Sequence, residues 1–199
     1  DKRNGLSNNF RSGVDYFINA KNTLSLTSSL SARNFTGKEN AVTLYNLATY
    51  STQYTNNKNR MDGQELMLDY KRTFDTEGQE LTANAIVSTN DRNSDENVER
   101  SDSALVKHKD KSNTDGTTNS FTFQTDFVKP IGNGGRLETG LKGIIKKQDA
   151  DYTFSTYIAS TWQDTANISN RYTLNDQIYA GYVIYSNTIG PIAYQGGVR

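Results

Sequence analysis

Short segments of this chain alternate between apolar and polar residues, and this alternation limits its fold more than any other feature. Leucine and alanine recur at every second position through much of residues 24–32, with serine and threonine between them. The same pattern returns over residues 80–88, where Leu81, Ala83 and Ala85 alternate with polar residues. A two-residue period is typical of a β-strand with one apolar face. None of these runs keeps the 3.6-residue period of a helix, so the sequence predicts an all-β chain.

Eight such strands are predicted, and the segments that connect them come in two lengths. The strands cover residues 9–18, 23–34, 63–74, 80–90, 120–128, 136–147, 170–185 and a last segment from residue 192. Short turns fall at residues 19–22, 75–79, 130–135 and 186–191, and long polar loops at 35–60, 91–119 and 148–169. Outer-membrane barrels keep short turns in the periplasm and long loops outside. We therefore expect an antiparallel, up-and-down transmembrane β-barrel of the outer membrane, with all four short turns on one side.

Composition agrees with a barrel and argues against several other classes. Hydrophobic residues make up 34% of the chain and the mean hydropathy is −0.76, which is a thin core for a soluble protein. A barrel needs no more, because only alternate strand residues face lipid. No apolar run reaches the ~18 residues of a transmembrane helix. The net charge of zero gives no sign of a nucleic-acid partner, and the absence of cysteine excludes disulfides and thiolate metal sites.

The alternation also predicts which way the strand residues point. Those expected to face lipid are Leu24, Leu26, Leu81, Ala83, Leu137, Leu141, Ile178, Ala180 and Tyr182. Those expected to face the lumen include Ser25, Thr82 and Asn84, and the charged side chains Glu65, Asp69, Lys71, Glu138, Lys142 and Lys146. A charged lining has three interpretations: it selects solutes, it holds a plug, or it pairs with itself. Aromatic residues before the short turns are expected to form a periplasmic girdle; they are Tyr16, Tyr70, Phe74, Phe127, Tyr182 and Tyr185.

Residues 170–182 carry a spaced pattern that resembles a known family. At every second position stand Asn170, Tyr172, Leu174, Asp176, Ile178, Ala180 and Tyr182. The pattern is similar to the N-x-F-x-Y-x-E-x-I-x-A-x-Y signature of the outer-membrane β-barrel family of Bacteroidetes, a branch of TonB-dependent-receptor-like proteins. Residues 124–142 resemble the family's Q-x-D-[YF]…P…LE-x-GLK block, residues 13–25 resemble an earlier hairpin, and residues 194–199 resemble a further strand of the family. The departures at Tyr172, Leu174 and Asp176, where Phe, Tyr and Glu are usual, are mild.

The resemblance implies that residues 1–199 are a partial barrel domain, with the plug and the remaining strands outside this sequence. It implies a non-enzymatic receptor for nutrient or siderophore uptake, whose partners are outer-membrane lipid, a plug, TonB and a small-molecule substrate. Two alternatives stay open. One is a small or structural outer-membrane barrel without energy-coupled transport, and the other is a soluble β-sandwich binding module. We expect no closed ring, because the segment from residue 192 is shorter than the ~9–11 residues of a spanning strand.

One segment resembles a cation-binding loop, although no catalytic, cofactor-binding or metal site is predicted. Asp91, Asn93 and Asp95 read as D-x-N-x-D, the opening of a calcium loop. Glu96 stands where that loop needs glycine, and the twelfth position is Asp102, whose side chain is shorter than the usual glutamate. A solvated acidic loop is therefore favoured over a calcium site.

Three other features are expected to be structural. His108 is the only histidine, lies between two lysines and is expected to be a solvated loop residue. Residues 132–135 are glycine-rich but lack the Lys-Ser/Thr of a phosphate loop, so they are expected to form a turn. Trp162, Tyr152 and Tyr157 are expected at the outer membrane interface, with ligand binding as the alternative.

Overall fold

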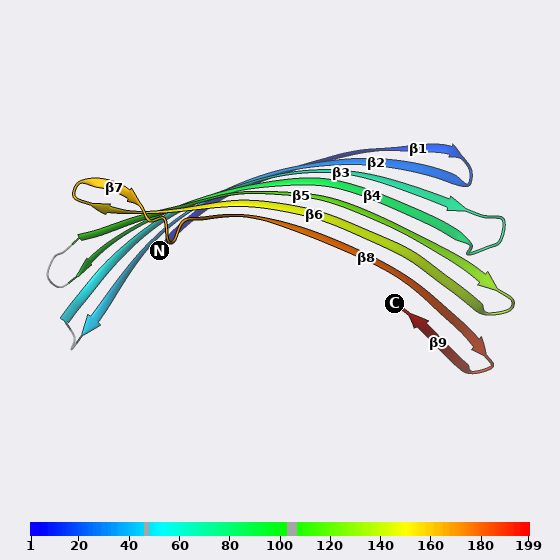
Figure 1. Ribbon diagram of the computed structural model, residues 1–199. Helices are drawn as coiled ribbons and strands as arrows, with labels where there is room; N and C mark the ends of the chain where they lie inside the picture. Colours follow the sequence, from blue (N-terminus) through cyan, green and yellow to red (C-terminus); the bar gives the residue numbers. More distant parts are fainter. Residues whose placement is uncertain (46–47, 103–106) are drawn as a thin grey trace.

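The computed structural model describes residues 1–45, 48–102 and 107–199 and shows one curved antiparallel sheet (Figure 1). Its strands within these ranges are β1 (Lys2–Asn19), β2 (Asn22–Tyr45), β3 (Ala48–Thr73), β4 (Glu80–Asp102), β5 (Lys107–Ile131), β6 (Gly135–Ile158), β7 (Thr161–Asp164), β8 (Asn170–Ile189) and β9 (Ile192–Val198). The order along the sheet follows the sequence, except that short β7 pairs only with β6. Every pair is antiparallel, which confirms the predicted meander. No helix in the described ranges is long and apolar enough to cross a bilayer.

The four predicted short turns lie together at one end of the sheet, on the right of Figure 1. They connect β1 to β2, β3 to β4, β5 to β6 and β8 to β9. The turn between β5 and β6 places Gly132 and Gly134 at φ of 59° and 93°. Glycine adopts this left-handed backbone at no steric cost. The glycine-rich segment is therefore a hairpin turn, as predicted, and does not lead into a helix.

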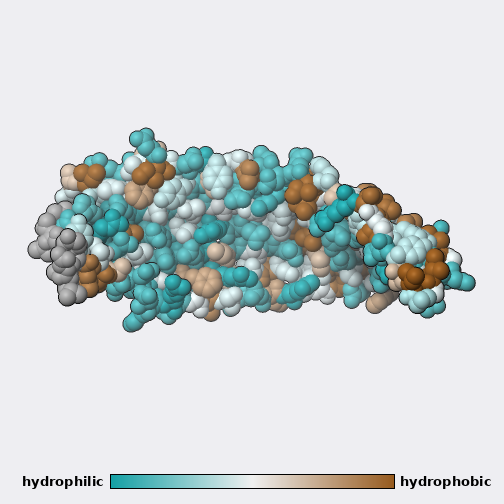
Figure 2. Space-filling model, turned by 90° about the horizontal axis from the view of Figure 1, so that it is seen from below, coloured by the Kyte–Doolittle hydropathy of each residue, from teal (hydrophilic) through white to brown (hydrophobic). Residues whose placement is uncertain are grey.

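Strands occupy most of the predicted long loops, so the predicted extent of those loops is wrong. β2 and β3 stay paired out to Tyr45 and Ala48, and β4 and β5 out to Ser101 and Lys107. In the third predicted loop β6 continues to Ile158, and β7 turns back on it. Strand segments that face no lipid need no apolar face, so the ladder continues while the alternation disappears. In Figure 2 hydrophilic side chains accordingly cover most of the visible face, and larger hydrophobic patches lie towards the short-turn end.

The strand register divides the side chains between two faces. We call the face of Leu141 the outer face and the face of Lys142 the inner face. One outer row of paired residues crosses the sheet as Val14, Leu26, Leu68, Ala85 and Phe123. The predicted lipid-facing residues of β2, β4 and β6 share this apolar outer face, as the alternation predicts, and their contact with lipid stays a prediction.

The inner face is the more crowded one in the last long strands. Along β5, Phe121 and Phe123 on the outer face are 42% and 41% exposed, whereas the inner residues between and beside them are half-buried. The same alternation occurs on β8 over residues 179–184. Side chains crowd on the concave side of a curved sheet, as on the luminal side of a barrel wall. The exposure pattern therefore agrees with a polar lumen.

Three residues of β8 that were predicted to face lipid lie on the inner face, so that prediction is wrong. Tyr182 pairs with Gly140, Ala180 with Lys142 and Ile178 with Ile144. The outer positions of this strand belong instead to Tyr179, Gly181 and Val183. The prediction failed because it assigned the face from apolar character alone, whereas the register across β6 determines it. Tyr182 is consequently not part of an outward-facing girdle.

The two edges of the sheet bear on the alternative folds. Within the described residues β1 pairs only with β2, and β9 pairs only with β8. The described chain therefore does not form the closed ring of the small-barrel alternative. Its strands also form one sheet, whereas a β-sandwich needs two sheets that pack face to face.

Candidate functional site

The inner face carries the charged residues that a solute or a plug would meet. All six charged side chains predicted to face the lumen lie on it, as the register shows; they are Glu65, Asp69, Lys71, Glu138, Lys142 and Lys146. Several are paired locally. Lys71 contacts Glu80 at 2.6 Å, and Arg136 contacts Glu138 at 3.1 Å. The lining therefore pairs partly with itself, which agrees with one of the three interpretations.

A hydrogen-bonded cluster links β5 to β8 across β6 on this face, near the short turns. The Tyr182 hydroxyl donates to Oδ1 of Asp126 at 2.7 Å, and the Gln124 amide donates to Oδ2 at 2.8 Å. Gly140 of β6 lies between Asp126 and Tyr182 in the ladder, so the tyrosine ring reaches from β8 to β5 across a residue without a side chain. Both oxygens of the carboxylate are thus engaged, and the cluster braces the sheet.

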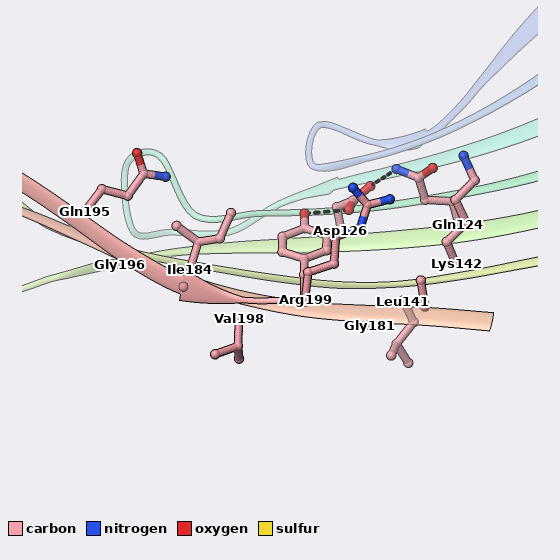
Figure 3. Close-up of a pocket in the computed structure, with 13 residues that line it drawn as sticks. Gln124, Asp126, Leu141, Lys142, Gly181, Ile184, Gln195, Gly196, Val198 and Arg199 are labelled. Atoms are coloured by element: carbon pink, nitrogen blue, oxygen red, sulfur yellow. Dashed lines mark hydrogen bonds between the residues drawn. The ribbon is translucent and has the colours of Figure 1, made fainter. Parts of the chain in front are cut away.

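A hollow of about 670 Å³ adjoins this cluster where β9 ends (Figure 3). Figure 3 shows Gln124, Asp126 and Lys142 on one side of the sheet, and Leu141 and Val198 on the other. Its polar lining consists of the side chains of Gln124, Asp126, Lys142, Tyr182, Gln195 and Arg199. The hollow borders the edge of β8 that faces β9. From Asn170 to Tyr182 this edge of β8 has no strand partner in the part of the chain that the structure describes. An extended strand fits such an edge as well as a solute does.

An apolar stripe crosses the inner face, and sequence reasoning missed it. One row of the ladder contains Met67, Ile86, Ile144 and Ile178, interrupted by Thr122. Rows with charged residues flank it on both sides, including Lys146 towards the long loops and Lys142 towards the short turns. The signal was present in the sequence as consecutive apolar residues, such as Ile144 followed by Ile145. Consecutive apolar residues in a strand place one of them on each face.

The calcium-like motif lies on a strand, where each of its residues has a cross-strand partner. Asp91 accepts a hydrogen bond from Thr117, and Asp95 accepts one from Asn113, at 2.7 and 2.8 Å. Asn93 donates to Asp115 at 2.5 Å. These side chains alternate along β4 on the outer face, so they do not surround a point as calcium ligands do. No group of three or more potential metal ligands occurs in the described residues.

The remaining candidate residues are scattered. His108 lies on β5 opposite Arg100, so it is an exposed strand residue and not part of a loop. Trp162 and Tyr157 form an edge-to-face pair with ring centroids 5.2 Å apart. Tyr157 follows Ile145 by twelve residues along β6, roughly 40 Å at ~3.3 Å per residue. Because barrel strands tilt by ~35–45°, this length corresponds to roughly 30 Å of height, and the predicted position at the outer interface stays a prediction.

Polar contacts surround the aromatic pair, and Tyr152 lies apart from it. The Lys111 ammonium lies 4.7 Å from the centroid of the Trp162 ring and covers one face of it. Beneath the β6–β7 hairpin the hydroxyl of Ser155, which is 1% exposed, donates to Asp164 at 2.6 Å. Tyr152 lies on the inner face, away from the aromatic pair. The three aromatic residues are therefore not one site.

Comparisons with known proteins agree with this architecture. The crystal structure of the ferric yersiniabactin uptake receptor FyuA from Yersinia pestis matches with a TM-score of 0.67 and 10% sequence identity. The match covers 95% of this chain and 27% of the receptor chain, so the sheet has the fold of part of a TonB-dependent receptor barrel. No curated protein matches the sequence. Residues 72–199, more than half of the chain, match the outer membrane protein beta-barrel family, and the chain therefore belongs to this family of the outer membrane.

Proposed function

We propose that this chain forms part of the barrel wall of a TonB-dependent receptor that takes up a nutrient or a siderophore. The observation that carries the proposal is the fit of nearly the whole sheet to a receptor barrel, with 95% of the chain covered. The chain spans 27% of that receptor, and such transporters have about 22 strands around a plugged lumen. The uptake activity, its substrate and its energy source belong to this proposal. No enzymatic step is part of it.

The apolar stripe on the inner face favours a filled lumen over an open pore. A water-filled channel has a polar lining. Met67, Ile86, Ile144 and Ile178 would instead expose a row of apolar side chains to water at mid-barrel. Covering these residues with a plug removes their apolar surface from water, which stabilises the assembly by roughly 25 cal/mol per Å² buried. The charged rows on either side would contact the plug's polar surface.

The test is uptake by the bacterium that encodes the intact protein. A strain without the gene is compared with its parent for accumulation of labelled iron chelates, vitamins and oligosaccharides, with and without the proton-motive force. We expect one class of nutrient to require both the gene and the energised membrane. Unchanged uptake of every nutrient, together with a leaky envelope, would instead support a structural barrel.

A matched pair of substitutions connects this test to the structure. Ile144→Asp places a charge in the inner apolar stripe, and Lys146→Asp changes the charge two residues away on the same face. If a plug covers the stripe, Ile144→Asp loosens it and makes the outer membrane permeable to large antibiotics. Lys146→Asp leaves the barrier largely intact. Equal permeability of the two variants would argue against a plug that packs on the stripe.

A further inference from the structure

Two arginines on the inner face suggest what kind of solute this receptor recognises, an inference that rests on the proposed uptake function. Arg33 of β2 and Arg92 of β4 both pair with Met61 of β3, one from each side. Their Cα atoms are two strand spacings apart, or roughly 10 Å. Both residues are exposed. Side chains of this length can converge on one ligand in front of Met61.

The structure leaves both guanidinium groups unneutralised. Neither Arg33 nor Arg92 has an ion pair or a side-chain hydrogen bond with any residue in the described ranges. The nearest inner carboxylates along β3 and β4 are Glu65 and Glu96, each four residues from this row. That is roughly 13 Å between Cα atoms, and neither carboxylate forms an ion pair with Arg33 or Arg92 in the described ranges. The positive charges of Arg33 and Arg92 are therefore available to a solute in the lumen.

The outer face at the same height is arranged in the opposite way. Arg60 contacts Asp62 at 2.6 Å, and Asp91 accepts a hydrogen bond from Thr117 at 2.7 Å. Asp62 and Asp91 adjoin the arginine row in sequence, but they point to the outer face, where these partners engage them. Charges on the outer face are thus satisfied by their neighbours. The two inner guanidinium groups differ, because no side chain in the described ranges forms an ion pair or a hydrogen bond with them.

Neutral hydrogen-bonding groups surround the arginine row. On one side, Ser31 and Asn90 approach each other over Gly63, where an added Cβ would lie 2.6 Å from the serine hydroxyl and 2.8 Å from the amide oxygen. On the other side, Ser94 donates to Asn59 at 2.7 Å. Amides and hydroxyls with two guanidinium groups, and no carboxylate between them, make a surface that favours anions. Arginine in particular binds carboxylate and phosphate oxygens through two parallel hydrogen bonds.

We propose that Arg33 and Arg92 form an anion-binding subsite on the inner face, which takes a carboxylate or phosphate group of the transported solute. The row lies beyond Leu30, on the side of the apolar band away from the short turns. A solute that enters from the long-loop side meets it before the membrane-spanning part. The two arginines would thus select anionic solutes at the entrance of the barrel.

The experiment measures anion binding to the intact purified protein in detergent. Equilibrium dialysis at low ionic strength uses labelled citrate and labelled inorganic phosphate as separate probes, because either chemical group fits the subsite. We expect Arg33→Gln and Arg92→Gln each to weaken binding at least tenfold, and the double variant to abolish it. Raising the salt concentration weakens the wild type. Arg60→Gln is the matched control, with the same residue type at the same height on the opposite face, and it should bind as the wild type does.

Three outcomes would overturn the subsite. These are no binding of either probe by the wild type, an equal loss in Arg60→Gln, and unchanged binding in the double variant. Each variant is first tested for folding by its faster migration on unheated gels. If a glutamine variant does not fold, Arg92→Lys replaces it, with an intermediate loss expected because lysine keeps the charge without the bidentate geometry. Binding needs no energised membrane, so its failure is distinguishable from a failure of TonB-dependent uptake.

Discussion

The hydroxyl of Tyr182 reaches Asp126 from two strands away, with 2.7 Å between Oη and Oδ1. Gly140 lies directly between them in the ladder. A Cβ at this position would lie 2.5 Å from a ring carbon of Tyr182 and closer still to the Asp126 carboxylate. Real side-chain atoms do not approach so closely. The contact between β8 and β5 therefore requires glycine at position 140.

The first prediction concerns this glycine. Gly140→Ala forces the tyrosine ring away and breaks its hydrogen bond to the carboxylate. Overpacking costs ~1–3 kcal/mol, and a lost hydrogen bond to a charged group ~1.5–3 kcal/mol. We expect the intact barrel to lose its heat-resistant gel mobility at a lower temperature. Tyr182→Phe should show part of the same loss.

Gly143→Ala is the control for this prediction. It lies on the same strand but on the outer face, and its added Cβ would meet Tyr179 at 3.5 Å, an ordinary contact. The variant should unfold at nearly the wild-type temperature. An equal shift for Gly140→Ala and Gly143→Ala would mean that strand propensity, and not the contact between Tyr182 and Asp126, sets the effect.

The second prediction tests the assignment of the two faces on β6. Leu141 is 62% exposed on the outer face, and Lys142 follows it on the inner face. An arginine at mid-membrane on the lipid face costs ~2–4 kcal/mol. Leu141→Arg should reduce the amount of folded protein in outer-membrane fractions far more than Lys142→Leu does. The reverse order would contradict a lipid-facing outer surface.

The third prediction tests the corrected orientation of β8. Tyr179 faces outward and Ile178 inward, as their pairing with Gly143 and Ile144 shows. Tyr179→Arg should impair membrane assembly, whereas Ile178→Arg should assemble and instead disturb whatever packs on the inner stripe. The measurement is the yield of folded protein in the outer membrane for each variant. A poorer yield for Ile178→Arg than for Tyr179→Arg would instead mean that Ile178 faces lipid, as its apolar character alone suggests.

The membrane-spanning strands were predictable because lipid imposes a pattern on them. Residues such as Leu24 and Leu26 must be apolar, so their strand, its turn and its facing follow from a two-residue period. Beyond the membrane no such demand exists. The ends of β2 to β5 away from the short turns are held together by cross-strand polar contacts, such as Asn113 with Asp95. In a single sequence such polar segments have the composition of a loop.

The inner face was predictable in its charges but not in its geometry. Alternation places Lys142 and Glu138 inside, as observed. It does not reveal that Arg33 and Arg92 share a row, because that depends on the register between strands far apart in sequence. The same limit explains the error at Tyr182, whose orientation follows from its pairing with Gly140.

The last prediction concerns the short turns. Lys21 in the β1–β2 turn donates to the carboxylate of Asp75 in the β3–β4 turn, and this hydrogen bond, with the lysine's charge, lowers the pKa of Asp75. A carboxyl whose pKa is lower in the folded state contributes stability above its unfolded pKa of ~3.9, and this contribution is lost as the pH falls through the folded value. Lys21→Met should therefore raise the Asp75 titration midpoint towards ~3.9, as followed by carbon-13 NMR of the carboxyl in detergent micelles. Lys21→Arg keeps the donor and the charge, so its midpoint should stay low. An unchanged midpoint in Lys21→Met would show that the two turns are not linked in solution.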